Sequence, residues 1–359
     1  MKKGRMLGIL LAAAMAFAGV AGTAGTRSVK ADSSNYKFDK QYTLKGGDSE
    51  TAKSPAETFT FGNSGKAELY QVQNTKFNTY TDGKSDTKKA DELTDDNIPK
   101  TITIGNVSFE EGQATSTGTK KEVSITTPDA SSYPGAGYYF YKFQETQGDT
   151  AGVTYNTDPY YIRVAVAYNS GTKTLEISNV TMFNNDWQKV TGIENYYSAG
   201  KLTIQKIVTG NMANSDDTFN VTVKFTPKEG TKLRSTIAGS STDSSLGEIK
   251  ISGDENEKTA TFKVKAETKV IFTNLPAGVT YTVEEEQANG YDTPAYKVNQ
   301  KENVNSGTIS AGSTDEAVIT NNKGTQIDTG VFMNNLPYLL VLIFAAACGV
   351  GFVVSKKRR

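Results

Sequence analysis

The stretch KLTIQKIVTG, residues 201–210, has the alternation of a β-strand. Side chains two residues apart in a strand lie on the same face, so Lys206 is in phase with the apolar Ile204 and Val208. An apolar face packs against a core, where an unpaired ammonium costs several kcal/mol or gives up its proton. The stretch therefore predicts a core-facing strand in which the lysine needs a special partner.

The strand-like pattern continues from residue 36 to residue 325, with Val, Ile, Thr, Tyr and Phe alternating with polar residues. Examples are GYYFYKFQE, DPYYIRVAVAY, TFNVTVKF and VTYTVEEE. No long 3.6-residue periodicity is present, so the sequence predicts an all-β fold of antiparallel sandwiches. Two polar insertions, residues 81–99 and 236–256, are predicted to be solvated loops or short helices.

The two ends of the chain predict export and membrane anchoring. Basic residues, the apolar run LGILLAAAMAFAGVAG and a small-residue site before Asp32 predict a signal peptide over residues 1–31, with an uncleaved membrane anchor as the alternative. Near the other end, the 19 apolar residues 336–354 are about long enough to cross a bilayer, and SKKRR after them favours a cytoplasmic end. We therefore expect a secreted chain held at its C-terminus.

The amino-acid composition excludes several kinds of partner and catalytic site. Nine of the 39 basic residues and none of the 39 acidic ones lie in residues 1–31 and 355–359, which leaves the exported part with an excess of nine acids and argues against nucleic acid as a partner. The sequence has no histidine, and its one cysteine, Cys348, lies in the predicted span, so Cys/His catalysis and His metal sites are excluded. A calcium loop at Asp82–Asp96 lacks the ligand spacing. We expect no metal and no cofactor.

A weak internal repeat predicts two domains. PGAGYYFYKFQE (134–145) resembles PAGVTYTVEE (276–285): each has a Pro/Gly turn and an aromatic strand that leads to a glutamate. Each copy follows a strand with an in-phase lysine and precedes a strand with an in-phase asparagine. The predicted domains are residues 32–199 and 200–325, stacked end to end across a very short connection, and residues 326–359 form the tail.

The strand phases place one lysine, one glutamate and one asparagine on the core face of each domain. The first trio is Lys40, Glu145 and Asn195. The second trio is Lys206, Glu285 and Asn321.

This combination predicts a reaction within the chain. Burial lowers the pKa of a lysine and raises that of a glutamate, so a proton can pass between them. The neutral amine is then a nucleophile, and the protonated acid polarises the asparagine carboxamide. Attack with loss of ammonia leaves a neutral Lys–Asn isopeptide bond, which removes the burial cost of the lysine. The alternative is that these residues snorkel to solvent or form buried ion pairs.

At these residues the chain resembles a Gram-positive backbone pilin of the streptococcal T-antigen type. The resemblance is carried by KLTIQKIVTG, NLPAGVTYTVEEE (274–286), AVITNNKG (317–324) and the C-terminal tail. It implies two Ig-like β-sandwich domains, each crosslinked by a Lys–Asn isopeptide bond that a glutamate promotes. The same six residues follow from the strand phases.

The resemblance also implies polymerisation by a pilus sortase. The motif would be QIDTG, residues 326–330, with Thr329 as the acyl donor and Gly330 leaving with the tail. Asp328 and Ile327 stand where the family usually has a proline, so the motif does not identify the sortase. Lys189, beside Trp187, is the residue that best matches the acceptor lysine, although it lies one residue closer to the asparagine than the family spacing.

The sequence therefore predicts a structural protein of the Gram-positive cell wall: a pilus backbone subunit joined to other copies of itself and anchored to peptidoglycan, with minor pilins or a host surface ligand as further partners. It is not expected to be a conventional enzyme, because each trio reacts once on its own chain. The rival is a singly anchored adhesin that does not polymerise. A carbohydrate-active enzyme is disfavoured, because about half of the aromatics in Tyr138–Tyr141 and Tyr160–Tyr161 should face the core and no carboxylate pair stands out.

Overall fold

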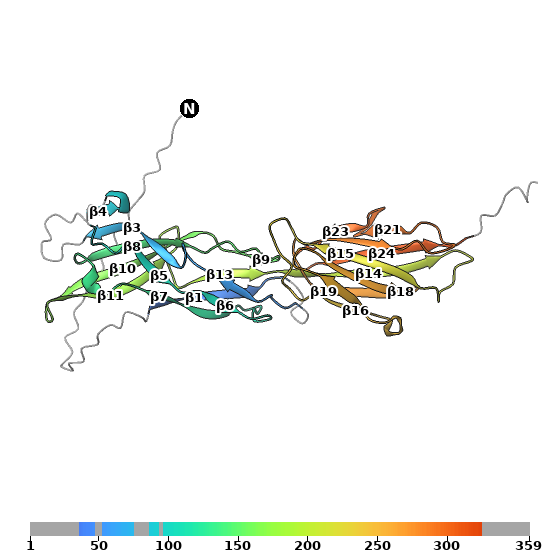
Figure 1. Cartoon of the computed structure of the whole chain (residues 1–359), viewed down its shortest axis with the longest axis horizontal. Coiled ribbons are helices and arrows are strands. Elements are labelled where there is room, and N and C mark those ends of the chain that lie inside the picture. The colour runs from blue at the N-terminus through green and yellow to red at the C-terminus, as the bar shows by residue number, and fades with distance from the viewer. Residues whose placement is uncertain (1–35, 47–51, 75–85, 93–95, 325–359) are drawn as a thin grey trace, which may run out of the picture. The chain divides into compact units, whose positions relative to one another are not determined.

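The computed structural model describes residues 36–46, 52–74, 86–92 and 96–324. In these ranges the chain forms 24 strands and three short 3₁₀ helices, so the predicted all-β class is confirmed (Figure 1). The predicted signal peptide, the QIDTG motif and the apolar segment 336–354 lie outside the described residues. None of the helices in the described part is long and apolar enough to cross a membrane.

We call residues 36–197 the first region and residues 199–324 the second region. The described residues of the first region form thirteen strands: β1 (Tyr36–Leu44), β2 (Glu57–Phe59), β3 (Lys66–Asn74), β4 (Asp86–Lys89), β5 (Thr101–Ile104), β6 (Val107–Phe109), β7 (Thr119–Thr126), β8 (Gly137–Gln144), β9 (Val153–Thr154), β10 (Pro159–Asn169), β11 (Thr174–Phe183), β12 (Lys189–Val190) and β13 (Gly192–Tyr197). Its 3₁₀ helices are η1 (Ala90–Glu92) and η2 (Ala130–Ser132).

The second region has eleven strands and one 3₁₀ helix, η3 (Ser244–Leu246). The strands are β14 (Ala199–Thr209), β15 (Phe219–Thr226), β16 (Ala238–Ser241), β17 (Lys250–Gly253), β18 (Lys258–Val264), β19 (Lys269–Pro276), β20 (Thr280–Glu285), β21 (Ala295–Val298), β22 (Lys301–Glu302), β23 (Ser306–Thr308) and β24 (Thr314–Asn322).

Strand β15 shows why these sequences form half-buried strands. Its sequence FNVTVKFT buries Phe219, Val221, Val223 and Phe225, and the residues between them are more exposed. Burying such side chains stabilises each by about 1.5–3 kcal/mol, and β-branched and aromatic residues fit the pleated surface. The period-2 pattern in the sequence is therefore the pattern of burial in the structure.

In the first region, hydrogen bonds join the strands into one sheet of eleven, in the order β12-β11-β10-β8-β3-β5-β7-β1-β13-β9, with β4 on β3. Strand β3 lies between β5 and β8 in this sheet: Lys66–Glu68 pairs with β5, and the strand pairs with β8 from Glu68 onward, with a register shift between Leu69 and Gln71. The sheet folds onto itself, so that Phe38 of β1 packs on Phe143 of β8 with ring centroids 5.9 Å apart. A separate pair, β2-β6, completes this region.

The second region consists of two packed sheets. One has the order β16-β19-β14-β24-β21-β22 and the other β17-β18-β15-β20-β23. Phe272 of the first sheet contacts Phe225 and Phe262 of the second, at ring-centroid distances of 5.2 and 5.7 Å. The apolar faces of both sheets therefore meet in one sandwich core.

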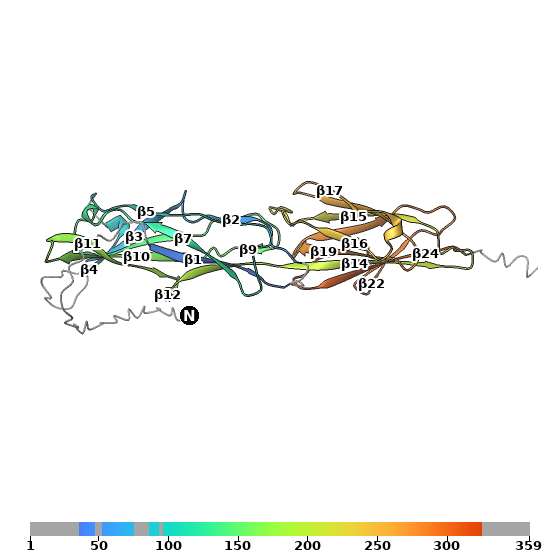
Figure 2. The same ribbon diagram turned by 90° about the horizontal axis from the view of Figure 1, so that it is seen from below.

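The first and last strands of each region lie side by side and run parallel, as Figure 2 shows most clearly for β14 and β24. In the first region β1 pairs with β13 in the same way. Gly192 permits this approach, because a Cβ there would lie 2.6 Å from the backbone oxygen of Asp39 on β1. The pairing brings together residues that are far apart in the sequence.

The buried apolar residues form two clusters. One extends from Phe38 to Ala199, and the other from Leu202 to Ile319 with the addition of Ala151. The predicted domain boundary after residue 199 lies at the first residue of β14, and only Ser198 separates β13 from β14. The division into two domains stays a prediction.

The polar insertion 236–256, expected to be a solvated loop or a short helix, contains the short helix η3 but also the strands β16 and β17, which were not expected. Each strand lies at the edge of its sheet, where one side of the backbone faces solvent and polar side chains are tolerated. The insertion 81–99 contains β4 and η1 among its described residues.

Candidate crosslinking sites

The first trio meets in the core of the first region. Lys40 comes from β1, Glu145 follows the last residue of β8, and Asn195 comes from β13. The Lys40 ammonium and the Nδ2 group of Asn195 donate to different oxygens of the Glu145 carboxylate. The exposed fractions of Lys40, Glu145 and Asn195 are 0%, 3% and 0%, so solvent does not reach them. The carboxylate bridges the amine and the carboxamide.

Aromatic rings surround the amine of Lys40. Its Nζ lies 4.4 Å from the ring centroid of Phe59 and 5.9 Å from that of Phe61. Burial lowers the pKa of Lys40 from 10.5 to about 8, although the charge and hydrogen bond of Glu145 oppose the change. Burial likewise raises the pKa of Glu145, against the opposing effects of Lys40, Asn195 and the backbone N–H of Asn156. Both shifts favour the neutral forms.

The second trio repeats the arrangement. Lys206 of β14 donates to Oε2 of Glu285 at 2.6 Å, and Nδ2 of Asn321 on β24 donates to Oε1 at 2.5 Å. The side chains of Lys206 and Glu285 are 0% exposed, as is Asn321. Nζ of Lys206 lies 4.0 Å from the ring centroid of Phe219, and burial lowers the pKa of Lys206. The two lysines therefore have the same kind of environment.

The strand register is identical in the two trios. Lys40 lies opposite Ile193, and Asn195 lies two residues further along β13. Lys206 lies opposite Ile319, and Asn321 lies two residues further along β24. Because residues two apart in a strand share a face, the lysine and the asparagine point to the same side of the sheet in both regions. The glutamate reaches them from a facing strand, β8 or β20.

The carboxamide oxygens differ between the trios. Oδ1 of Asn195 accepts a hydrogen bond of 3.2 Å from the backbone N–H of Asn156. Oδ1 of Asn321 is buried, and no group in the described part of the chain donates to it. The contact of Asn156 could not be predicted from the sequence, because a backbone N–H is present at every non-proline residue and leaves no signal in side-chain patterns.

Lys189 is exposed at the start of β12, where it pairs with Phe183 of β11. Trp187 beside it is 44% exposed and stacks on Tyr161, with centroids 4.5 Å apart and an interplanar angle of 18°. It also meets the edge of Phe140. Thr329 and Gly330 lie outside the described residues.

About half of the β8 and β10 aromatics face the core, as expected: Tyr139, Tyr141 and Tyr160 belong to the core cluster. More of them are buried than face the core. Every aromatic of Tyr138–Tyr141 and Tyr160–Tyr161 except Tyr138 is buried. The reason is that Trp187 covers Phe140 and Tyr161 on the face opposite the core. These rings are packed together rather than arranged as an open platform for a sugar.

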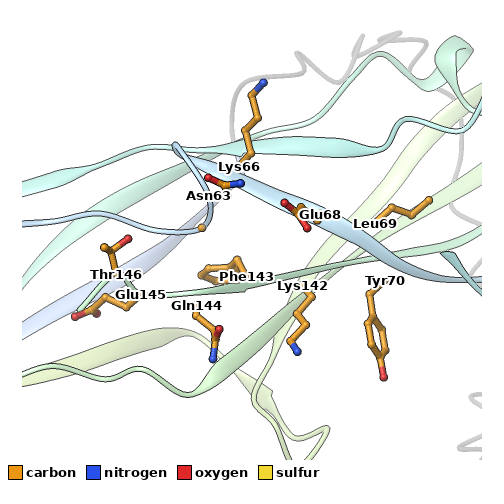
Figure 3. A pocket seen from close by; sticks show the side chains of 11 residues that line it. Asn63, Lys66, Glu68, Leu69, Tyr70, Lys142, Phe143, Gln144, Glu145 and Thr146 are labelled. Carbon is orange, nitrogen blue, oxygen red and sulfur yellow. The ribbon is translucent and has the colours of Figure 1, made fainter. Parts of the chain in front are cut away.

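An open hollow of about 510 Å³ is lined by residues of β3, of β8 and of the segments next to them, and Glu145 of the first trio is among these residues (Figure 3). The exposed side chains of Lys66, Glu68 and Lys142 line it. Glu145 also borders it, but its carboxylate is bound to Lys40 and Asn195. Among the described residues no group of three or more His, Cys, Asp or Glu side chains is placed to hold a metal, and Asp82 lies outside these residues.

The fold and the trios define a class: an all-β protein whose first and last strands pair in parallel over a buried Lys–Glu–Asn trio, twice along one chain. Comparison with known proteins gives one curated relative and several solved structures. The chain is 25% identical over 240 residues to a pilin of Streptococcus pyogenes serotype M1, which covers 61% of this chain and 68% of that protein. This similarity confirms the predicted resemblance to streptococcal major pilins.

Solved structures of two pilins are also similar to the chain. The major pilin of Streptococcus pyogenes has a TM-score of 0.49 at 20% identity, covering 80% of this chain and 98% of that one. The major pilin T3.2 of the same species, serotype GAS13637, has a TM-score of 0.49 at 22% identity, covering 80% and 97%. Residues 200–323 match a family model described as a domain of unknown function (DUF7601).

Proposed function

We propose that the chain is a structural subunit of a covalently polymerised pilus on a Gram-positive cell wall, stiffened by two self-formed Lys–Asn isopeptide bonds. The observation that carries the proposal is the pair of buried trios in one shared register. A buried lysine–glutamate ion pair alone contributes little to stability, because desolvation offsets the attraction. A carboxamide held on the same carboxylate in both regions supports a reaction instead.

The chemistry needs no further reactant. Lys40 passes a proton to Glu145, and its neutral Nζ forms a bond to Cγ of Asn195. The bond from Cγ to Nδ2 then breaks, and Nδ2, which already carries two hydrogens, takes up one further proton that the attacking amine gives up by way of Glu145 and leaves as ammonia. The products are one secondary amide, one ammonia and a Glu145 carboxyl group that keeps the proton taken from the Lys40 ammonium. Lys206, Glu285 and Asn321 follow the same course.

The position of the bonds suits a load-bearing subunit. Each bond would join the first strand of a region to its last strand, so tension along the chain could not pull these strands apart without breaking a covalent bond. The described residues contain no cysteine, so no disulfide supplies this reinforcement there. In the proposed fibre, the load passes from strand to strand through the two amides.

Polymerisation is the second half of the proposal. A pilus sortase would join the Thr329 carbonyl of one subunit to Lys189 of the next, with release of Gly330 and the tail. The exposure of Lys189 at the start of β12 supports its role as the acceptor. Anchoring to peptidoglycan, and contacts with minor pilins or a host ligand, belong to the same proposal.

Expression of the chain together with a pilus sortase in a Gram-positive host tests polymerisation. The expected result is a ladder of covalent multimers that survives boiling in detergent. Lys189→Arg should abolish the ladder, whereas Lys142→Arg, which also changes an exposed lysine of the first region, should keep it. A single anchored species with the unchanged chain would contradict polymerisation and favour the adhesin.

A further inference from the structure

The contact between Asn156 and Asn195 fixes the orientation of a reacting group. A backbone N–H can only donate, so the end of the Asn195 carboxamide that it meets, at 3.2 Å, is the oxygen. Nδ2 then faces Glu145, to which it donates. In the first trio, therefore, the carboxylate contacts the nitrogen that leaves, and a different group contacts the carbonyl oxygen.

The segment before β10 holds this N–H in place. Nδ2 of Asn156 donates to the Tyr160 hydroxyl at 3.0 Å, and Oδ1 of Asn156 accepts from the Asp158 N–H at 3.2 Å. The second contact is an Asx turn, which stabilises the local backbone. Tyr160 is buried and lies on β10, next to β8, which leads to Glu145. The donor is therefore oriented before any reaction begins.

The second trio lacks such a donor in the described part of the chain. Oδ1 of Asn321 is buried without a hydrogen-bond partner there, and Nδ2 donates to Glu285 at 2.5 Å. The backbone N–H of Glu285 donates to the hydroxyl of Tyr296. The two asparagines thus share a carboxylate contact and differ at the carbonyl oxygen.

We propose that the backbone N–H of Asn156 is an oxyanion donor for the first trio, and that the first bond consequently forms faster than the second. The inference rests on the proposed isopeptide chemistry. As Nζ of Lys40 bonds to Cγ of Asn195, the electron pair of the C=O bond moves onto Oδ1. The N–H stabilises this charge, and the charge returns when the bond to Nδ2 breaks and ammonia leaves. A fixed donor in a water-excluded site contributes about 10²–10³-fold in rate.

Asn156→Pro removes this N–H and is the direct test. The N–H makes no backbone–backbone hydrogen bond among the described residues, so proline removes no strand pairing. The matched control is Asn156→Ala, which keeps the N–H and loses the side chain. Both are made in an Asn321→Ala chain, in which only the first bond can form and the pair of Lys206 with Glu285 remains.

The chains, residues 32–325, contain every residue that the structure describes. Each is synthesised in a cell-free system, trapped in urea within minutes and refolded by dilution, and intact mass follows the loss of one ammonia. Asn156→Pro should slow the loss about 10²–10³-fold, and Asn156→Ala only several-fold. Equal rates for the two variants would overturn the oxyanion role. A parent chain that never loses ammonia would refute the proposed function instead.

A second comparison needs no proline and remains decisive if Asn156→Pro does not fold. The Asn321→Ala chain reports only the first bond, and an Asn195→Ala chain reports only the second. The first bond should form faster by at least about tenfold. A second bond that forms as fast as the first would contradict the proposal, because the Asn321 carbonyl oxygen, which has no donor among the described residues, would then be at no disadvantage.

Discussion

The first and second trios are built on the same pair of parallel strands, yet the surroundings of their asparagines differ. In both, the lysine lies opposite the residue two positions before the asparagine, and one carboxylate bridges the two side chains. Within the described part of the chain, only Asn195 also has a donor on its carbonyl oxygen, from the segment before β10. The sheet therefore sets which groups meet, and a short segment outside the sheet sets how the carboxamide is polarised.

Replacing the glutamate should have the largest effect. Glu145→Gln should abolish the first bond and leave the second intact, because glutamine cannot accept the proton of Lys40 and return it to the leaving nitrogen. Intact mass should then show the loss of one ammonia instead of two. Glu285→Gln should give the same mass by losing the other bond.

Each glutamine variant should also be less stable. By analogy with a disulfide closing a loop of more than 100 residues, a lost crosslink costs about 5 kcal/mol, measurable by urea unfolding. Loss of both ammonia molecules in either variant would show that the glutamate is not required.

A substitution at Gly192 should slow the first bond without slowing the second, and its effect should be smaller than that of replacing a glutamate. In Gly192→Ala the new Cβ would lie 2.6 Å from the Asp39 backbone oxygen, so β13 must move away from β1. A displacement of about 1 Å at a reacting group costs about 100-fold in rate. The first bond should slow by that order and the second should not, as followed by mass during refolding. Gly135→Ala, whose Cβ would meet nothing within 4 Å, is the control.

The smallest expected effect is that of pH on the rate of the first bond, which should change by about tenfold per pH unit outside its optimum. The reaction needs one proton shared between Lys40 and Glu145, so the rate should be highest between the pKa values of the pair. Above about pH 8, the lowered pKa of Lys40, the pair has lost this proton and the rate should fall. At the acid side the fall should begin above the usual range of a glutamate, because burial raises the pKa of Glu145.

The rate of the first bond, measured from pH 5 to pH 10 in the Asn321→Ala chain, checks this prediction. For the second bond, the rate of formation should likewise fall as the pH is raised, and this fall should begin before pH 10.5, since burial lowers the pKa of Lys206. A rate that keeps rising to pH 10 would mean that the neutral amine acts without the protonated glutamate.

The core-facing positions of the trio residues can be predicted from the sequence, because side chains alternate between the two faces of a strand. The in-phase lysine in KLTIQKIVTG predicts a core-facing Lys206, and the phases of Glu285 and Asn321 predict that they face the same core. All three side chains are buried together. Whether the trios react stays a prediction.

Other features depend on contacts that no local pattern encodes. Asn156 acts through its backbone, and the burial of Phe140 and Tyr161 depends on Trp187, which arrives from a different part of the chain. The strands of residues 236–256 pair at sheet edges, where a polar sequence hides the strand pattern.

The intact mass of residues 32–325, produced without any sortase, tests the central claim most directly. The predicted result is a deficit of two ammonia masses, with Lys40→Ala and Lys206→Ala each restoring one. A mass equal to that of the unmodified sequence would contradict the account, and the two trios would then be buried polar clusters without a covalent bond.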